Sequence, residues 1–161
     1  MERAIAIESL AIRRQDLNCA DAKLLIGALN VELAAQYPEP GANHFSLDAQ
    51  EVAASHGAFL IGYMSVDPVA CGAIRCIESG VAEIKRMYVV PSARGRGISK
   101  MILTALEECA RQLGVGRLVL ETGVRQAEAI GLYLGCGFGH IAHFGEYVGS
   151  PLSVCMAKSL T

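Results

Sequence analysis

The sequence predicts a mixed α/β (α+β) fold, with a mostly antiparallel central sheet and helices on both faces of the sheet. Three observations predict it. Apolar runs in the middle of the chain are separated by turns too short for a crossover, which is typical of antiparallel strands. Segments with the apolar period of a helix precede and follow these runs. One such helix separates two strand-like runs, and this spacing predicts one parallel pair.

The first third of the chain is expected to be mainly helical. The apolar segment 5–10 is expected to form a first strand. Residues 16–37 carry leucines and alanines at helical spacing, and the proline- and glycine-containing segment 38–41 ends this helix. Residues 47–55 are expected to form a short second helix.

Strand-like runs fill the centre of the chain. Each ends at a turn signal, which is Asp-Pro, Ser-Gly or a single proline. In the last of these runs side chains should alternate between the faces, so that Glu83 and Met87 share one face and Arg86 lies on the other. The expected strands span residues 57–66, 69–78 and 81–90.

The last third alternates between helices and strands. Residues 98–113 have an apolar stripe at helical spacing, and Gly114 follows as a stop. Because this helix lies between the strands 81–90 and 117–122, those two strands are expected to be parallel neighbours. A further helix and two C-terminal strands are expected at 126–134, 139–144 and 152–160.

Composition limits the classes of protein to which this chain can belong. Its 161 residues are 52% hydrophobic and 19% charged, which favours a single folded domain over 1–161. The net charge of −2 disfavours a nucleic-acid partner. No apolar stretch approaches the ~18 residues of a membrane span, so we expect no membrane partner. The surplus of apolar residues is compatible with a homodimer.

The six cysteines do not form a metal-binding pattern. None belongs to a C-x-x-C pair, and no histidine lies at zinc-ligand spacing from two of them. Most lie in apolar runs, which is typical of small buried residues in a reducing compartment. The N-terminal segment lacks the long apolar core of a secretion signal. We therefore expect a cytoplasmic protein without a metal.

Residues 91–100 carry the strongest functional signal. The third strand ends here, an arginine- and glycine-rich turn follows, and a helix begins at Ile98. The N–H groups at such a helix start, together with Arg94, Arg96 and Lys100, predict an anion-binding site. A P-loop needs Gly-Lys-Ser/Thr and a dinucleotide fingerprint needs a third glycine, and this loop has neither.

The pattern that the loop does fit is Arg/Gln-x-x-Gly-x-Gly/Ala, with Ser99 in place of the last small residue. It reads Arg94-Gly95-Arg96-Gly97-Ile98-Ser99. This resembles the coenzyme A pyrophosphate loop of the GNAT superfamily of acyl-CoA-dependent N-acetyltransferases. The preceding strand (EIKRMYVVP), the segment LETG and the helix EAIGLYLGCGF are similar to the neighbouring family elements, in the same order. The resemblance covers about residues 5–160.

The resemblance implies a GNAT-like fold, in which two parallel strands splay apart and the arm of acetyl-CoA lies between them. In this chain those strands would be 81–90 and 117–122. The backbone of Met87 would bind the thioester carbonyl, and that of Val89 the pantetheine amides. The residues that the resemblance places on the cofactor are Met87, Tyr88, Val89, Arg94, Gly95, Arg96, Gly97, Ile98, Ser99 and Lys100.

The resemblance also implies catalytic roles. Tyr133 matches the family's tyrosine near the cofactor sulfur and would protonate the departing thiolate; otherwise it is the amphipathic edge of a helix. Glu83 is the first candidate for the base that deprotonates the amine, unless it is a solvated residue paired with Lys85 or Arg86. Glu121, at the end of the partner strand, is the second candidate.

The predicted activity is acetyl transfer from acetyl-CoA to a primary amine, preferably of a small molecule, by direct attack in a ternary complex. The alternatives are a non-catalytic acyl-CoA-binding or regulatory module, an acetyltransferase of protein N-termini or lysines, and a nucleotide-binding protein. Four acidic residues in the first third hint at a cationic acceptor, although surface solvation explains them equally well: Glu32, Glu39, Asp48 and Glu51. Three residues of the last hairpin loop either line the acceptor pocket or form a turn with an anchoring aromatic: Phe144, Glu146 and Tyr147.

Overall fold

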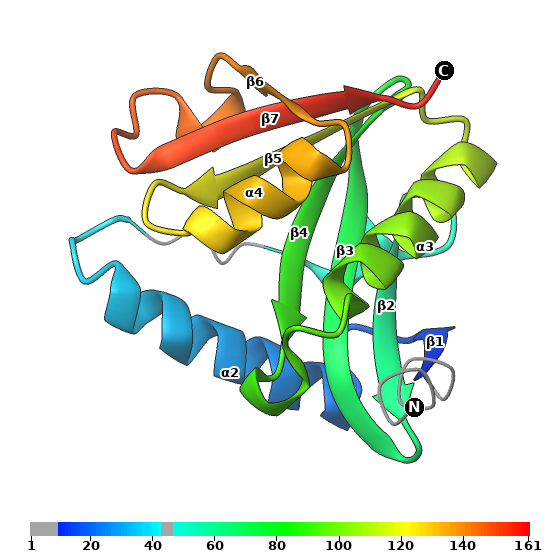
Figure 1. Ribbon diagram of the computed structural model, residues 1–161. Helices are drawn as coiled ribbons and strands as arrows, with labels where there is room; N and C mark the ends of the chain where they lie inside the picture. The colour runs from blue at the N-terminus through cyan, green and yellow to red at the C-terminus, as the bar shows by residue number, and fades with distance from the viewer. Residues whose placement is uncertain (1–9, 43–46) are drawn as a thin grey trace.

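One twisted sheet organises the chain, and helices cover both of its faces (Figure 1). The computed structural model describes residues 10–42 and 47–161. The strands in these residues are β1 (Leu10–Arg14), β2 (Gly57–Met64), β3 (Asp67–Glu78), β4 (Val81–Val89), β5 (Arg117–Gly123), β6 (Gly139–Ile141) and β7 (Ser153–Ser159). The α-helices are α2 (Ala20–Gln36), α3 (Ile98–Gln112) and α4 (Ala127–Gly135), and the short 3-10 helices are η1 (Ala49–Val52), η2 (Pro91–Ala93) and η3 (Gly145–Tyr147).

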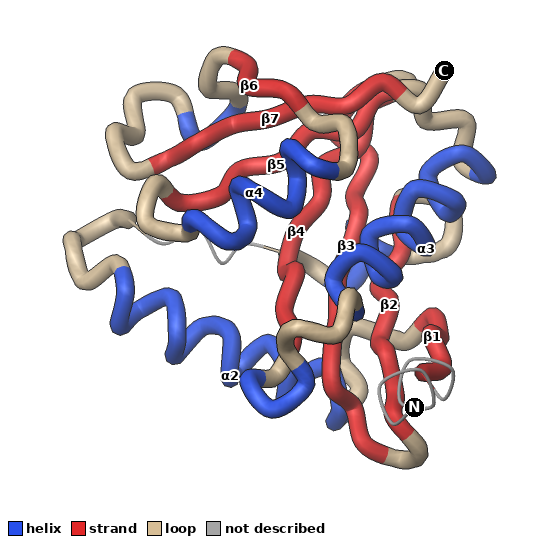
Figure 2. The backbone as a smooth tube through the Cα atoms, viewed as in Figure 1, coloured by secondary structure: helices blue, strands red, loops and turns tan. Residues whose placement is uncertain are grey.

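The order of the strands confirms the predicted fold class. The strands lie in the order β1-β2-β3-β4-β5-β7-β6, and Figure 2 shows them side by side with the helices outside the sheet. Neighbouring strands are antiparallel, except that β4 and β5 are parallel. The helix α3 connects these two strands, as the sequence predicts, because a parallel pair needs a crossover connection.

The helices bury two separate apolar clusters, one on each face of the sheet. On one face, Leu25 of α2 packs in a cluster with Phe59 of β2. On the other face, Ile102 and Leu106 of α3 pack in a cluster that also contains Tyr133 of α4. The predicted placement of helices on both faces is therefore confirmed, and each helix is held by the burial of its apolar stripe.

Two predicted elements near the N-terminus differ from the structure or lie outside it. The predicted strand 5–10 falls outside the described residues except for Leu10, where β1 begins. The predicted helix 47–55 is only the single 3-10 turn η1, because Ala53 adopts an extended conformation directly after it. A segment this short makes too few intrahelical hydrogen bonds to repay its nucleation cost.

The alternation expected for the third strand is broken by a β-bulge at Arg86. Cys71 and Ala73 of β3 are two residues apart, but their partners on β4, Tyr88 and Lys85, are three residues apart. Arg86 takes up the extra residue with a φ of 59°, which lies in the left-handed region that non-glycine residues rarely adopt.

The bulge reverses the facing of every β4 side chain that follows it. Met87 packs in the cluster that α3 covers, whereas Tyr88 joins the cluster that α2 covers. Glu83 is opposite Arg75 in β3, and Tyr88 is opposite Cys71. Arg75 and Cys71 are four residues apart in β3 and share a face, so Glu83 lies with Tyr88 on the α2 face. The prediction that Glu83 and Met87 share a face is therefore wrong, because strict alternation assumes a strand without an inserted residue.

We predict that Leu106→Ala lowers the free energy of unfolding by about 2–5 kcal/mol, because this fully buried side chain leaves a cavity in the α3 core. Urea unfolding followed by circular dichroism measures the change. Leu24→Ala is the matched control, since Leu24 is 64% exposed on α2 and its truncation should cost less than about 0.5 kcal/mol. Equal losses in the two variants would contradict the assignment of the core.

Candidate active site

β4 and β5 separate partway along their length and leave an opening in the sheet (Figure 1). Their parallel ladder runs from Val81–Arg117 to Ile84–Leu120. Beyond that point β5 continues to pair with β7, while β4 continues along β3 as far as Val89. Among the described residues, the outer edge of β4 therefore has no strand partner after Ile84. The bulge at Arg86 lies at this point, and a bulge bends and twists the strand that contains it.

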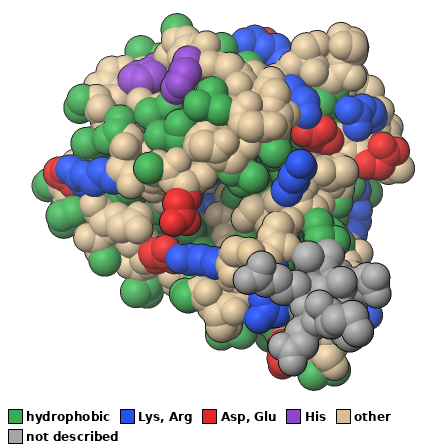
Figure 3. All heavy atoms as spheres, viewed as in Figure 1, with side chains coloured by type: hydrophobic (Ala, Val, Ile, Leu, Met, Phe, Trp, Pro, Cys, Tyr) green, Lys and Arg blue, Asp and Glu red, His purple; other side chains and the backbone are tan. Residues whose placement is uncertain are grey.

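A groove of about 740 Å³ begins at this opening and runs to the start of α3. Its volume is in the range of sites that bind cofactor-sized molecules. Every residue predicted to contact the cofactor lines the groove except Arg96. The other lining residues come from α2, from α4 and the two residues before it, and from Ala93 of η2. Figure 3 shows acidic and basic side chains close together on this face of the molecule.

The loop before α3 has the backbone geometry of an anion site at a helix N-terminus. Gly95 and Gly97 have φ values of 80° and 78°, a backbone conformation that favours glycine, and a Cβ added at either position meets no protein atom within 4 Å. Gly97 is the N-cap of α3, and the first intrahelical bond joins the N–H of Met101 to its carbonyl at 3.2 Å. The N–H groups of Ile98 to Lys100 thus precede the helical ladder, as an anion site at a helix N-terminus requires.

Arg94 joins the loop to both β4 and α2. Its Nε donates to the carbonyl of Val89 at 2.8 Å, and its guanidinium lies 5.6 Å from the centre of the Tyr88 ring. Its Nη2 donates to Glu32 at 2.8 Å, and this bond raises the pKa of Arg94. The Val89 backbone, predicted to bind the cofactor, thus already has its carbonyl engaged. Successive residues of a strand direct their backbone N–H and C=O groups to opposite edges. The N–H of Val90 bonds the carbonyl of Val69 in β3, so the N–H of Val89 points away from β3, to the outer edge of β4.

A second, smaller cavity of about 120 Å³ adjoins the groove at the opening. Residues of α2, β4 and β5 form much of its wall, and residues of α4, η3 and the loops beside these elements complete it. The cavity and the groove share four lining residues: Leu29, Met87, Gln126 and Tyr133. A ligand in the groove and a ligand in the cavity would therefore meet beside these four side chains.

Tyr133 lies where the cavity and the groove join, which agrees with its predicted place. The ring packs edge-on against Phe138 at a centroid distance of 5.6 Å, and burial raises the pKa of Tyr133 above that of an ordinary phenol. A phenol in this environment keeps its proton over the physiological range and is suited to donate it.

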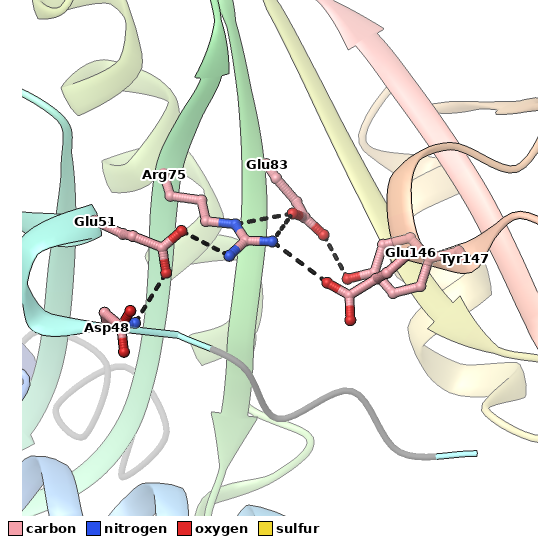
Figure 4. A network of polar contacts seen from close by, with 6 residues as sticks. All are labelled: Asp48, Glu51, Arg75, Glu83, Glu146 and Tyr147. Carbon is pink, nitrogen blue, oxygen red and sulfur yellow. Dashed lines mark hydrogen bonds and ion pairs between the residues drawn. The ribbon is translucent and has the colours of Figure 1, made fainter. Parts of the chain in front are cut away.

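Glu83, the first candidate base, is enclosed in a buried polar network (Figure 4). It is 1% exposed, and Arg75 donates to its Oε1 from Nε at 3.0 Å and from Nη2 at 2.9 Å. The hydroxyl of Tyr147 donates to Oε2 at 2.6 Å. Arg75 also bonds Glu51 at 2.8 Å and lies 3.6 Å from Glu146. Arg75 is therefore the cation that bonds Glu83 through two nitrogens, and Lys85 interacts with Glu83 electrostatically.

Glu121, the second candidate base, is placed differently. It lines the small cavity at the end of β5, and the Ser153 hydroxyl donates to its Oε2 at 2.7 Å. In the part of the chain that the structure describes, Glu83 lines neither the cavity nor the groove. The geometry therefore favours Glu121 as the carboxylate that an amine in the cavity would meet.

The cavity also contains two cationic residues whose role the sequence did not reveal. Lys85 and Arg86 are consecutive in β4 and both line it. The available signal was the presence of two adjacent cations in an otherwise apolar strand. Tyr147 lines the cavity as well, which supports the pocket interpretation of the last hairpin loop for this residue, and it packs edge-on against Phe144.

The acidic residues that hinted at a cationic acceptor are mostly paired with arginines. Glu32 pairs with Arg94, Glu51 with Arg75, and Glu39 with Arg125. The bond to Arg125 lowers the pKa of Glu39 to about 2. Asp48 is the N-cap of η1, where it forms a capping box with Glu51. The structure thus gives these carboxylates local partners, and the hint at a cationic acceptor loses its basis.

The described residues offer no grouping of three or more His, Cys, Asp or Glu side chains that could hold a metal ion. All six cysteines lie in this part of the chain and have free thiols, two of them buried and Cys76 exposed. No helix in residues 10–42 and 47–161 is long and apolar enough to cross a membrane.

The Acetyltransferase (GNAT) family matches residues 27–138, and the chain belongs to this family. It is 43% identical over 137 residues to an IAA acetyltransferase of Azospirillum brasilense, an alignment that covers 84% of this chain and 88% of that protein. A "putative acyl-CoA N-acyltransferase" of Klebsiella pneumoniae has a structure with a TM-score of 0.80 and 33% identity, over 94% of this chain and 98% of the other.

A more distant neighbour, the PaiA N-acetyltransferase of Thermoplasma acidophilum, was solved in complex with coenzyme A. Its TM-score is 0.70 at 17% identity, over 94% of this chain and 99% of that one. The likeness shows a shared fold. These findings confirm the predicted family and the class of enzyme, an acetyltransferase.

We predict that Glu83→Gln lowers the free energy of unfolding by roughly 3 kcal/mol, because it leaves the largely buried Arg75 guanidinium without its buried carboxylate and with the more exposed Glu51 as its bonded anion. Urea unfolding measures the loss. Glu78→Gln, at an exposed position at the end of β3, is the matched control and should change stability little. A Glu83→Gln protein of unchanged stability would show that the network is not structural.

Proposed function

We propose that this protein transfers an acetyl group from acetyl-CoA to the primary amine of a small molecule, by direct attack in a ternary complex. The observation that carries the proposal is the meeting of the cofactor-sized groove and the small cavity at Met87, Gln126 and Tyr133. Two ligands held in these two spaces would have their reactive ends side by side, and alignment of this kind supplies much of the rate of a bimolecular reaction.

The residues of the groove fit coenzyme A. The glycine conformations and the open N–H groups of the loop before α3 suit the pyrophosphate, and the unpaired outer edge of β4 suits an extended arm that adds to the sheet. When bound, acetyl-CoA supplies an acetyl group that its thioester already activates. No metal or covalent intermediate is needed for an amine to attack such a thioester.

Each remaining task has a candidate among the residues of this chain. In the reaction the amine nitrogen forms a bond to the acetyl carbon, the carbon–sulfur bond breaks, the nitrogen loses a proton and the sulfur gains one. We assign the first proton transfer to Glu121, which lies in the cavity, and the second to Tyr133, which lies at the junction. The backbone N–H of Met87 lies at the same junction and is assigned to the developing oxyanion.

The size of the cavity favours a small acceptor. At about 120 Å³ it is enclosed by side chains from both sides of the opening, and it offers little room for a protein segment. We therefore prefer a small amine to a protein N-terminus or lysine. A single domain over 1–161, a location in the cytoplasm and a homodimer stay predictions from the sequence.

The proposed function is tested by release of free thiol from acetyl-CoA in the presence of a panel of amines. We predict that Tyr133→Phe lowers kcat by about tenfold or more and changes the KM for acetyl-CoA much less, because the hydroxyl acts on the departing sulfur. Glu121→Gln should lower kcat as well. An unchanged kcat in Tyr133→Phe would remove this residue from the mechanism, and no thiol release with any amine would refute the activity.

Binding of coenzyme A is tested separately by calorimetry. We predict that Gly97→Ala weakens binding by about tenfold, because Gly97 lines the groove and its φ of 78° disfavours alanine. Arg94→Ala should also weaken it, through the loss of a charge beside the anion site. Gly27→Ala, in α2 with open space around it, is the control and should bind normally. Unaltered affinity in both loop variants would place the cofactor elsewhere.

A further inference from the structure

We infer that the acceptor is an amine that also carries an anionic group, of which a carboxylate is the simplest, and that Arg86 binds this group with help from Lys85. The inference rests on the proposed function, because it concerns the substrate class of the same site. An α-amino acid or a compound like it has this chemistry.

The position of Arg86 and Lys85 is the first observation. Both residues line the small cavity, directly after the point where β4 leaves β5. They are 8% and 6% exposed, so their charges are largely removed from bulk water. Burial lowers the pKa of both side chains, since it disfavours the charged form. An anion bound beside them would offset this cost.

The backbone is the second observation. In a regular strand two consecutive side chains point to opposite faces, and a bulge changes this alternation. Lys85 and Arg86 both lie in the cavity wall at the bulge, where Arg86 has a φ of 59°. A strained non-glycine residue that lies in the wall of a ligand site is more common where function requires it.

The orientation of Arg86 is the third observation. Its Nη1 donates to the side-chain carbonyl oxygen of Asn30 in α2 at 2.6 Å. This bond fixes one side of the planar guanidinium. A fixed guanidinium matches the two oxygens of a carboxylate better than a lysine ammonium does.

The charges around the cavity are the fourth observation. Glu83 and Glu146 interact electrostatically with Lys85, and Arg75 shares both of these carboxylates, so Lys85 is partly balanced by the network. Arg86 is affected by Glu121 across the opening. This gives a cation from β4 and a carboxylate from β5 on opposite walls, the complement of a molecule with both an ammonium and a carboxylate.

Matched pairs of acceptors test the inference without any mutation. Thiol release is measured with methionine, phenylalanine, serine and glutamate, each paired with its own carboxamide, together with phenethylamine and spermidine. In the wild-type protein kcat/KM should be about tenfold to a hundredfold higher for the carboxylate than for the carboxamide of at least one pair. Carboxamides that react as well as their carboxylates, or activity confined to amines without an anion, would overturn it.

Variants then assign the preference to Arg86. We predict that Arg86→Asn reduces the ratio of the two kcat/KM values to near one, and asparagine is chosen because it tolerates a positive φ. Lys85→Gln should reduce the ratio less. Arg117→Asn, at an exposed position that opens β5, should keep the wild-type ratio. A wild-type ratio in Arg86→Asn would overturn the role of Arg86.

A binding measurement separates this inference from the proposed function. Calorimetry of the preferred carboxylate acceptor, titrated into protein saturated with coenzyme A, should show binding that Arg86→Asn weakens by about tenfold or more. If coenzyme A binds and only amines without an anion are acetylated, the inference fails and the proposed function stands. If coenzyme A does not bind and no thiol is released, both the proposed function and the inference are refuted.

Discussion

The β-bulge at Arg86 is the constraint on which the site depends. It inserts one residue into β4 at the place where the parallel ladder with β5 ends. A bulged strand bends, so the two strands separate beyond this point and expose one edge of β4. The groove for the cofactor, the small cavity and their junction all lie along this opening. The cost is one arginine held in a conformation that suits glycine or asparagine better.

Charged pairs hold the rest of the site around this opening. Arg94 connects the anion-binding loop to α2 through Glu32, and Arg125 connects the start of α4 to the end of α2 through Glu39. These pairs are partly exposed and contribute little stability individually. Their effect is geometric, since they join three elements that are distant in the sequence along the two sides of one groove.

The buried network around Glu83 has a different character. Its carboxylate accepts bonds from Arg75 and Tyr147 and lies out of reach of the cavity. Breaking one side of such a pair is costly, because the other charge stays buried without its buried partner. The network therefore fixes the last hairpin loop, through Tyr147, against β3 and β4. Glu121, which a simple strand pattern ranked second, is the carboxylate that reaches the cavity.

The sequence alone determined most of the described elements, their order and the glycine-rich loop before α3, although the helix expected at 47–55 is only the turn η1. The loop and the helix after it depend on local signals, such as glycines, a proline and an apolar stripe, which act over a few residues. The parallel pair followed from the length of one connection. Only the tertiary structure decided which side chains meet in the cavity. The bulge at Arg86 inverts the face of every later residue in β4, and no local signal marks it. The partners of Glu83 lie 8 and 64 residues away in the chain, so packing alone brought them together.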